Sequence, residues 1–504
     1  MDLELLLTMA VSADPDRRSV TGPDGRSLTC AELDERARAA AGLLRDTGAA
    51  HIAFCDTNGL AFPVTLFGAV MARRPFVPLN YRLADAQLEQ IVAGQDLVVV
   101  ASPEQAERLR RLGAPSVVES EALLAAPTGG SEPDGRPIDT DDVALLLYTS
   151  GTTAAPKAAV LRHRHLAAYV IGTVEFGSAD PDAAALLSVP PYHIAGVMNL
   201  LSNLYMGRRV VYLDQFDPER WLQIVREQSI THAMVVPTML ARIVAALGDG
   251  PADTPSLRTL SYGGAKMPTA VIERALALFP SVAFANAYGL TETSSTIAVL
   301  GPDDHRAATE STDPAVRARL GSVGQPLPGV EIEIRDEEGR PCPAGVSGDV
   351  IVRGEQVAGE YLGTDAGSAE PGWFATRDKG HLDDGGYLFI EGRSDDTIIR
   401  GGENIAPAEI EDVLLRHKAV ADCAVVGVED EEWGQRIAAA VVLAEGATAT
   451  PDDLRAFARE QLRGSKTPDV ITVVDSLPYT DTGKLLRRVV RQTLAAAPTA
   501  PGGG

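Results

Sequence analysis

The sequence predicts an α/β protein: a large N-terminal domain of doubly wound sheets plus a small β subdomain, followed by a small α+β C-terminal domain. Three observations predict this arrangement. The 504 residues exceed what one hydrophobic core usually supports. Between about 185 and 285, short β-prone runs alternate with helical segments of about 10 to 15 residues, which is typical of parallel strands with crossover helices on both faces. After about 320, glycine and proline become frequent and hairpins are expected.

The first elements are predicted from a helix cap and from apolar runs. Thr29 and Glu32 have the spacing of a capping box, so a helix is expected from there to about Gly48. Short apolar or β-branched runs between polar segments are then expected to form buried strands. The strand candidates of this part are 51–55, 97–101, 143–148, 186–189, 209–213, 232–236, 259–262 and 282–285.

Beyond 320 the pattern predicts hairpins and then a compact terminal unit. Pro407 and Pro451 mark helix starts, because the missing N–H of proline would be unpaired in a first helical turn anyway. The expected strands are 330–335, 350–353, 397–400, 420–428 and 436–443, with the second helix over 451–462. We therefore expect a large domain over 1–392, a hinge over 393–396, a small mobile domain over 397–490 and a disordered tail over 491–504.

Composition excludes several classes of function. A formal net charge of −24 argues against a nucleic-acid partner, which would require a basic surface. No apolar run is long enough to span a bilayer, and the acidic N-terminus does not look like a signal peptide, so a cytoplasmic location is expected. The expected oligomeric state is a monomer or a homodimer. The four cysteines are widely spread without a Cys-x-x-Cys pair, which favours neither a disulfide framework nor a zinc site.

The strongest local motif is the ten-residue run YTSGTTAAPK, which directly follows the apolar run 143–147. Hydroxyl residues around a glycine, closed by a lysine, suit a loop that wraps phosphates with backbone N–H groups and hydroxyls. A Ser/Thr-rich surface turn is the alternative. The run is not a Walker A loop, which needs G-x-x-x-x-G-K-[ST]. The candidate phosphate-binding residues are Thr149, Ser150, Gly151, Thr152, Thr153 and Lys157.

Four further motifs follow in order: NAYGLTE at 286–292, GWFATRD at 372–378, GRSDD at 392–396 and PYTDTGK at 478–484. With the phosphate loop, they resemble the adenylate-forming superfamily of acyl- and aryl-CoA synthetases, non-ribosomal-peptide adenylation domains and beetle luciferases, over about 30 to 485. The resemblance implies an enzyme that uses ATP, Mg²⁺ and coenzyme A. A carboxylic acid would react with ATP to give acyl-AMP and pyrophosphate, and a thiol would then attack the mixed anhydride.

Within these motifs, each residue type suits one part of a nucleotide. Tyr288 offers an aromatic face for adenine. Thr291 supplies a hydroxyl for the α-phosphate, and Glu292 a hard carboxylate for Mg²⁺, although it could also be an ordinary acid at a helix start. Asp378 can accept both ribose hydroxyls, and Arg393 matches the family's ribose and phosphate contact. The remaining candidates allow close backbone approach or flank these groups: Gly263, Gly264, Ala265, Asn286, Ala287 and Gly289.

Lys484 is the predicted catalytic lysine. Negative charge develops as the carboxylate attacks the α-phosphorus, and an ammonium about 4 Å away is worth roughly 4 kcal/mol at an effective dielectric near 20. The resemblance also assigns catalytic roles to Thr291, Glu292 and His193, and places His193 at the entrance of the acid pocket, although a buried structural histidine is the alternative. His163 and His165 are interpreted as the polar start of the helix after the phosphate loop, since no third metal ligand is suitably spaced.

The expected walls of the acid pocket are mostly apolar, which favours an aromatic or short-to-medium-chain acid. They are His193, Val235, Val236, Pro237, Met239, Ser261, Gly264, Asn286 and Ile297. For the second half-reaction, Gly401, Gly402 and Glu403 resemble the segment that lines the pantetheine tunnel. Arg463 and Lys466 could meet the CoA phosphates, and Asp395 matches the pivot of the small domain.

Some positions depart from the family pattern, and some functions stay open. Ala154 and Ala158 stand where glycine is most common, and Arg377 stands where glycine commonly precedes the ribose-binding Asp378. Transfer to an amine, as in an amide synthetase, would retain every motif, and transfer to a carrier-protein thiol is a further alternative. A P-loop phosphotransferase would need a Gly-Lys-Ser/Thr core, and a non-catalytic nucleotide sensor would be expected to lack Lys484 or Glu292.

Overall fold

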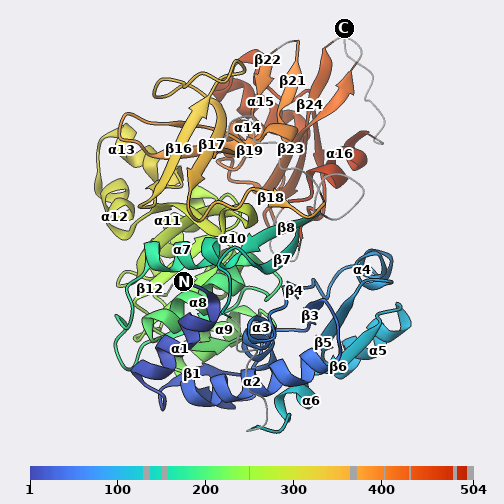
Figure 1. The fold of residues 1–504 in the computed structure, drawn as a ribbon. Coiled ribbons are helices and arrows are strands. Elements are labelled where there is room, and N and C mark those ends of the chain that lie inside the picture. Colours follow the sequence, from blue (N-terminus) through green and yellow to red (C-terminus); the bar gives the residue numbers. More distant parts are fainter. Residues whose placement is uncertain are drawn as a thin grey trace.

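The computed structural model describes residues 1–128, 137–149, 157–248, 250–363, 372–401, 403–430, 433–480 and 485–495, without the side chains of Thr149 and Asn404 (Figure 1). Two large sheets form the N-terminal part, and the four-stranded sheet and the terminal unit lie together at the top of Figure 1. The predicted α/β class with its smaller C-terminal unit is confirmed. Within the described ranges, no helix is long and apolar enough to cross a membrane.

The larger sheet has nine strands with a parallel centre and antiparallel edges. In spatial order they are β15 (Gln325–Pro326), β14 (Ser295–Leu300), β13 (Ala283–Leu290), β12 (Thr259–Gly263), β11 (His232–Val235), β9 (Ala184–Leu187), β10 (Arg209–Tyr212), β1 (Arg18–Thr21) and β2 (Ser27–Thr29). The strand expected over 282–285 therefore extends to Leu290 and turns back as β14.

The second sheet has seven strands, again parallel at its centre. Their order is β18 (Glu360–Tyr361), β8 (Lys157–Arg162), β7 (Val143–Thr149), β4 (Phe76–Pro78), β3 (His51–Cys55), β5 (Leu97–Ala101) and β6 (Ser116–Glu119). The helices of the large domain are α1 (Leu3–Ala13), α2 (Cys30–Asp46), α3 (Ala61–Met71), α4 (Asp85–Val92), α5 (Pro103–Arg111), α6 (Ser120–Leu124), α7 (His163–Thr173), α8 (Ile194–Met206), α9 (Pro218–Glu227), α10 (Pro237–Leu247), α11 (Thr269–Leu278), α12 (Pro302–Glu310) and α13 (Pro314–Ala318).

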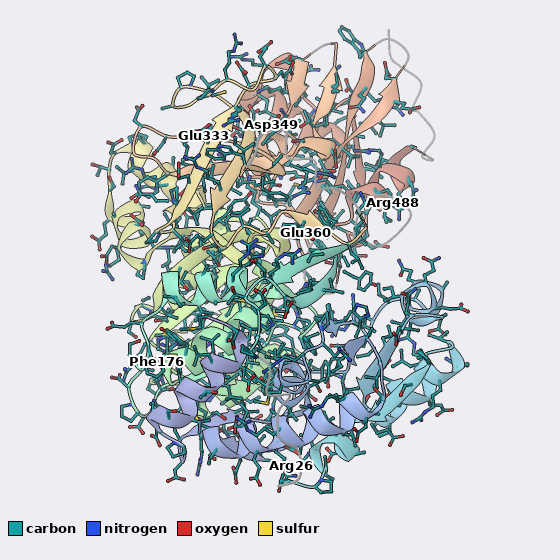
Figure 2. The ribbon with its side chains drawn as sticks, in the orientation of Figure 1. Arg26, Phe176, Glu333, Asp349, Glu360 and Arg488 are labelled. Atoms are coloured by element: carbon teal, nitrogen blue, oxygen red, sulfur yellow. The ribbon has the colours of Figure 1, made fainter. Side chains whose placement is uncertain are left out.

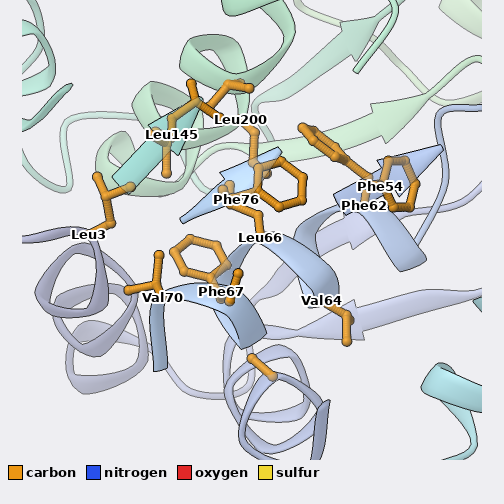
Figure 3. Close-up of a cluster of buried hydrophobic side chains, with 14 of the residues drawn as sticks. Leu3, Phe54, Phe62, Val64, Leu66, Phe67, Val70, Phe76, Leu145 and Leu200 are labelled. Atoms are coloured by element: carbon orange, nitrogen blue, oxygen red, sulfur yellow. The ribbon is translucent and has the colours of Figure 1, made fainter. Parts of the chain in front are cut away.

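Alternating side chains show that both sheets are covered on two faces. Leu187 and Tyr212 point into a core shared with α3 and α8, whereas Leu186 and Val211 pack with α9, α10 and α11 on the other face. Every residue of α3 is buried, as expected for a helix that is apolar all round and packed between layers. Phe54, Phe62 and Phe76 meet in this shared core, with ring centroids 5.7–6.4 Å apart (Figure 3). The doubly wound prediction is confirmed.

Two local predictions are refined by the structure. Thr29 and Glu32 form the predicted capping box at the start of α2. The helix after the phosphate loop begins at His163 as predicted, but strand β8 separates it from the loop. The side chains of His163 and His165 are buried rather than solvated, and this burial lowers the pKa of both to about 4. Both imidazoles are therefore neutral at pH 7.

The C-terminal part contains three small sheets. The first is the β subdomain, with the order β16 (Val330–Arg335), β17 (Gly348–Gly354), β19 (Phe374–Leu382) and β20 (Leu388–Arg393). The terminal unit has the hairpin β21 (Ile398–Arg400) and β22 (Glu403–Ile405), and a sheet of β23 (Val420–Asp430), β24 (Gly434–Leu443) and β25 (Val470–Val473). Its helices are α14 (Pro407–Leu414), α15 (Pro451–Gln461) and α16 (Arg487–Ala495).

The prediction of a disordered tail from 491 is wrong for residues 491–495. These residues complete α16, whose apolar residues Val490 and Leu494 are spaced four apart on one helix face and are buried against β23 and β24. The short apolar repeat was hidden in the composition of the last 14 residues, which is dominated by Ala, Pro and Gly. Residues 496–504 lie outside the described ranges.

A buried ion pair holds α16 onto the terminal unit. The Arg487 guanidinium donates to the Glu411 carboxylate of α14 at 2.8 Å and to the Val425 carbonyl of β23 at 2.7 Å. Glu411 also accepts the Val425 amide at 2.7 Å, and its side chain is 11% exposed. Because both charges are buried, Glu411 depends on Arg487 for its pairing, and Arg487 has Asp396, at 3.6 Å, as its second carboxylate.

We expect Glu411→Gln to destabilise the terminal unit by about 3 kcal/mol, since it removes the nearer of the two carboxylates that pair with the buried Arg487 charge. Glu409→Gln on the same helix is the control, because Glu409 pairs with Lys466 but is 46% exposed and such pairs contribute little. The difference in stability is measured by denaturant unfolding, with limited proteolysis of the terminal unit as the readout. Equal stability of the two variants would contradict the role of this ion pair.

Candidate active site

The centre of the site is the buried carboxylate of Asp378 in β19. Tyr288, from β13 of the nine-stranded sheet, donates its hydroxyl to Asp378 Oδ2 at 2.6 Å. Arg393, which faces Asp378 across β19 and β20, donates to Oδ1 at 3.1 Å. Asp378 is 6% exposed, so its charge needs such donors. The structure thus brings together three nucleotide-binding candidates that lie up to 105 residues apart in the sequence.

The donors leave lone pairs on both carboxylate oxygens, so Asp378 can still accept further hydroxyl groups. Burial and the Asp378 charge raise the pKa of Tyr288, which keeps its hydroxyl protonated as a donor. That hydroxyl is committed to Asp378. Stacking of adenine on the ring face of Tyr288 stays a prediction.

The glycines of these motifs allow neighbouring strands to approach closely. A Cβ atom on Gly263 would lie 2.2 Å from the Ala287 carbonyl oxygen, and one on Gly289 would lie 1.8 Å from that of Ser295. Gly264 has φ +85°, a left-handed conformation that favours glycine directly after β12. Gly263 and Gly289 are therefore required by the packing of β12, β13 and β14, and Ala287 and Asn286 lie in the same strand. Close approach of a nucleotide to this edge stays a prediction.

Glu292, the predicted metal ligand, lies in a one-turn 3₁₀ helix between β13 and β14, together with Thr291. It is 7% exposed. The Tyr361 hydroxyl donates to Glu292 Oε1, and the backbone carbonyl of Glu292 accepts the amides of Ala358 at 2.8 Å and Gly359 at 3.3 Å. Burial and the Glu292 charge raise the pKa of Tyr361, so this phenol stays a donor. Both the side chain and the backbone of Glu292 are thus fixed by one segment.

Tyr361 was not predicted from the sequence. It lies in the two-residue strand β18, which pairs with β8 so that Tyr361 faces Ala159. Arg162 on β8 and Glu360 on β18 form a 2.8 Å ion pair, and Figure 2 shows Glu360 where the two strands run side by side. Because β18 is short and its partner strand is about 200 residues earlier, no local pattern marks it.

The phosphate-loop motif connects two antiparallel strands. Thr149 ends β7 and Lys157 begins β8, and these two residues face each other in the hairpin. Ser150, Gly151, Thr152 and Thr153 lie outside the described residues, as do Lys484 and Gly402. Strand β8, which follows the loop, also pairs with β18, the strand that carries Tyr361.

Within the described ranges, no cluster of three or more His, Cys, Asp or Glu side chains could hold a metal ion. Glu292 is the single protein carboxylate that the motif offers. This fits Mg²⁺, which keeps several waters and binds through one or two carboxylates plus substrate phosphates. The ion would be held jointly by Glu292 and the nucleotide.

His193 stands just before α8, where the predicted acid pocket begins. Its Nε2 atom is buried and has no hydrogen-bond partner in the described part of the chain. Burial, and next the positive charge of Arg82, lower the pKa of His193 to about 4, so the ring is neutral at pH 7. The ring of Tyr192 packs against the His193 ring, with the two ring centroids 4.6 Å apart. An unpartnered polar atom at this place suits contact with a substrate.

One group of the other predicted pocket residues lies near β11 and α10, and a second group makes contacts elsewhere. Val235, Val236, Pro237 and Met239 are buried where β11 meets α10, and Ser261 donates to the Ala233 carbonyl at 3.3 Å. Asn286 is committed to the Ser322 carbonyl at 3.0 Å. Ile297 packs instead in the core of the β subdomain. The apolar character predicted for the pocket therefore depends on α10.

The candidate CoA residues of the terminal unit are brought together by Arg400. Its guanidinium donates to the Ser465 carbonyl at 3.1 Å and to Asp469 at 2.7 Å, which ties the β21–β22 hairpin to the turn at Gly464–Lys466. Gly401 and Glu403 lie on the hairpin, and Arg463 and Lys466 lie at the turn. Arg400 was not predicted as a site residue, because an isolated arginine in a strand carries no motif.

The hinge candidate Asp395 lies in the turn Ser394–Asp396, between β20 and β21. On the large-domain side, Ser394 and Asp349 are hydrogen-bonded at 3.1 Å. On the other side, Arg487 is 3.6 Å from Asp396. A further contact joins the two parts: Lys266, next to Ala265, forms a 2.7 Å ion pair with Asp412 of α14. The role of Asp395 as pivot stays a prediction.

We expect Tyr361→Phe to raise by about 10-fold the Mg²⁺ concentration that gives half-maximal ATP-dependent pyrophosphate release. Loss of a residue that orients a metal ligand typically weakens metal binding by about that factor. The control is Tyr387→Phe, since Tyr387 donates to Asp304 on α12 at 2.6 Å and thus forms a similar pair away from Glu292. Matching Mg²⁺ titrations for the two variants would show that Tyr361 does not position a metal ligand.

Comparison with characterised proteins agrees with this geometry. The chain is 36% identical over 481 residues to a feruloyl-CoA synthase from Amycolatopsis sp, which covers 93% of this chain and 94% of that protein. The structure superposes on o-succinylbenzoate coenzyme A synthetase (MenE) from Bacillus subtilis in complex with ATP and magnesium, with a TM-score of 0.83, 26% identity, and coverage of 97% of this chain and 98% of that one.

A similar match is found with the amide bond synthetase McbA from Marinactinospora thermotolerans. Its TM-score is 0.84 at 28% identity, covering 98% of this chain and all of that one. Two family profiles also match, namely that of the AMP-binding enzyme over residues 7–362 and that of the AMP-binding enzyme C-terminal domain over residues 409–484. The chain therefore belongs to the AMP-binding enzyme family.

Proposed function

We propose that the protein activates a carboxylic acid with ATP as its acyl-AMP and passes the acyl group to the thiol of coenzyme A. The observation that carries this proposal is the Asp378 carboxylate, held by Tyr288 and Arg393, together with the Glu292–Tyr361 pair, whose Glu292 follows Tyr288 by four residues. The arrangement offers acceptors for ribose hydroxyls and a carboxylate for a phosphate-bound cation. The similarity to a CoA synthase and to an ATP- and magnesium-bound synthetase supports the same assignment.

In the first half-reaction, a carboxylate oxygen of the acid attacks the α-phosphorus of ATP. The new P–O bond forms as the bond to the β-phosphate oxygen breaks, and the electron pair leaves with pyrophosphate. Asp378 and Arg393 hold the ribose, Thr291 and the phosphate loop hold the phosphates, and Lys484 neutralises the developing charge. Mg²⁺, when bound at Glu292, supplies further neutralisation of the phosphate oxygens.

The second half-reaction begins when the CoA sulfur attacks the acyl carbon. The C–S bond forms, the bond to the AMP oxygen breaks, AMP leaves with that electron pair, and the thiol proton passes to solvent. Gly401, Gly402 and Glu403 would line the thiol path, while Arg463 and Lys466 would meet CoA phosphates. One small domain cannot present both Lys484 and this path to the same site without rotating, so Asp395 is proposed as the pivot.

The acid is proposed to be aromatic or of short-to-medium chain length. The buried apolar residues at the start of α10 favour an uncharged acyl group, and His193 is neutral at pH 7. Its unpartnered Nε2 suits one polar substituent on that group. We propose that the enzyme is cytoplasmic, where ATP and CoA are available, and acts as a monomer or homodimer.

A second acceptor class follows from the similarity to an amide bond synthetase. An amine would attack the same acyl-AMP carbon, and every residue of the first half-reaction would keep its role. A carrier-protein thiol is the third acceptor. The first half-reaction is common to all three, so the acceptor is decided by the second.

The test is pyrophosphate release from ATP–Mg²⁺ with a panel of aromatic and aliphatic acids, followed by addition of CoA or amines. We expect adenylation of an aromatic or short-to-medium-chain acid and formation of its CoA thioester. Amide formation without thioester would replace the proposed acceptor. Absence of pyrophosphate release with every acid would contradict adenylation itself.

In the same assay, Lys484→Ala should slow acyl-AMP formation by about 10²-fold or more, a loss of roughly 3 kcal/mol of transition-state stabilisation. It should leave thioester formation from pre-made acyl-AMP largely intact, because the charge it neutralises develops only in adenylation. Equal losses in both half-reactions would refute this role.

A further inference from the structure

Arg377 has a backbone conformation that residues other than glycine rarely adopt. It lies in β19 with φ +62°, one of five non-glycine residues with positive φ among the described residues. The left-handed region brings Cβ close to the following carbonyl oxygen, so glycine is favoured there. This accounts for the glycine that the resembling family commonly has before the ribose-binding Asp. In this chain an exposed arginine occupies that position.

A bulge in β19 creates this conformation. Lys379 pairs with Asp349 and Ala375 pairs with Ile351, so the three residues 376–378 face the single residue Val350 on β17. Bulges of this kind redirect side chains and are frequent beside active sites. Here the bulge directs Asp378 inward to Tyr288 while Arg377 stays exposed.

Both neighbours of Arg377 are fixed by hydrogen bonds. Thr376 donates its hydroxyl to the Val350 carbonyl at 2.8 Å and accepts the Asp378 amide at 3.1 Å. A single Arg393 nitrogen, Nη1, donates to both the Thr376 carbonyl and the Asp378 carboxylate, each at 3.1 Å. The strained backbone is therefore determined from both sides, and strain that is retained in this way is typical of functional sites.

The Arg377 guanidinium forms no hydrogen bond or ion pair with any other described residue. The next cation on the strand, Lys379, is paired with Asp349 at 3.3 Å. Arg377 directly precedes Asp378, whose carboxylate binds the Tyr288 hydroxyl, and Tyr288 lies four residues before Glu292 in the chain. Arg377 thus adjoins the ribose-binding candidate Asp378, and its charge has no partner among the residues that the structure describes.

We propose that Arg377 binds the phosphate chain of the nucleotide, as a specificity residue that this chain has in place of glycine. The proposal rests on the proposed function, because the phosphates of a bound ATP would lead from a ribose held at Asp378 toward a cation held at Glu292. The Arg377 guanidinium would donate to phosphate oxygens with its planar fork, which matches their geometry. It would add positive charge at a site that is set in a protein of net charge −24.

The test measures ATP binding by calorimetry, without acid or CoA, for wild type and for Arg377→Gly, Arg377→Gln and Arg377→Lys. We expect Arg377→Gly and Arg377→Gln to weaken ATP binding by about 10-fold, as for the loss of one charge-assisted contact. Arg377→Lys should retain most of the affinity because it keeps the charge. The KM for CoA should not change in any of the variants.

Thermal unfolding separates binding from folding. Arg377→Gly should leave Tm unchanged or higher, because relief of the left-handed strain offsets the greater flexibility of glycine in the unfolded chain. Ser229→Gly is the control for strain, since Ser229 has φ +49° just after α9, and it should leave ATP binding unchanged. Wild-type ATP affinity in Arg377→Gly, a rise in the KM for CoA alone, or a marked fall of its Tm would each overturn the proposal. The proposed function fails separately, if wild-type protein adenylates no acid.

Discussion

The Asp378 carboxylate is the interaction on which the rest of the site depends. It is a buried charge that is stable only because Tyr288 and Arg393 donate to it. These donors come from different parts of the fold, namely β13 of the nine-stranded sheet and β20 of the β subdomain. The candidate nucleotide site is therefore complete only when the β subdomain packs on the nine-stranded sheet.

Several other features follow from this placement. Arg393 ends β20, and the turn Ser394–Asp396 that leads to the terminal unit follows directly, so the residue that holds Asp378 lies at the border of the two parts. The bulge that turns Asp378 inward forces Arg377 into its left-handed conformation. On the neighbouring strands, Gly263 and Gly289 let β12, β13 and β14 approach closely enough to carry Tyr288 to the carboxylate. These backbone constraints thus position the charged side chains of the site.

How far the sequence predicts this site depends on the kind of residue. Tyr288, Asp378 and Arg393 lie in motifs whose spacing and residue types indicate nucleotide chemistry. The structure brings the three side chains together, and their contact with a nucleotide stays a prediction. The alternation of strands and helices likewise predicts the parallel centre of the nine-stranded sheet, because burial on both faces makes those strands apolar. The sequence therefore predicts the elements and residues that short patterns of neighbouring residues mark.

Residues that act through distant partners were missed for a physical reason. Tyr361 lies in a strand of two residues, and its meaning comes from Glu292 and from β8, both far away in the sequence. Arg400 and Arg487 are single arginines whose partners are carbonyls and carboxylates on other elements. Arg377 is the intermediate case. The sequence marks it as a departure from the family pattern, but its strain is visible only in the backbone.

The most direct measurement of the central claim compares ATP with 2′,3′-dideoxy-ATP for binding to wild type and to Asp378→Asn. If the Asp378 carboxylate accepts the ribose hydroxyls, wild type should prefer ATP by about 10-fold or more, the value of a hydrogen bond to a charged group. Asp378→Asn should lose most of that preference, because the cycle isolates the contact between this side chain and the hydroxyls. An unchanged preference in the variant would contradict the account.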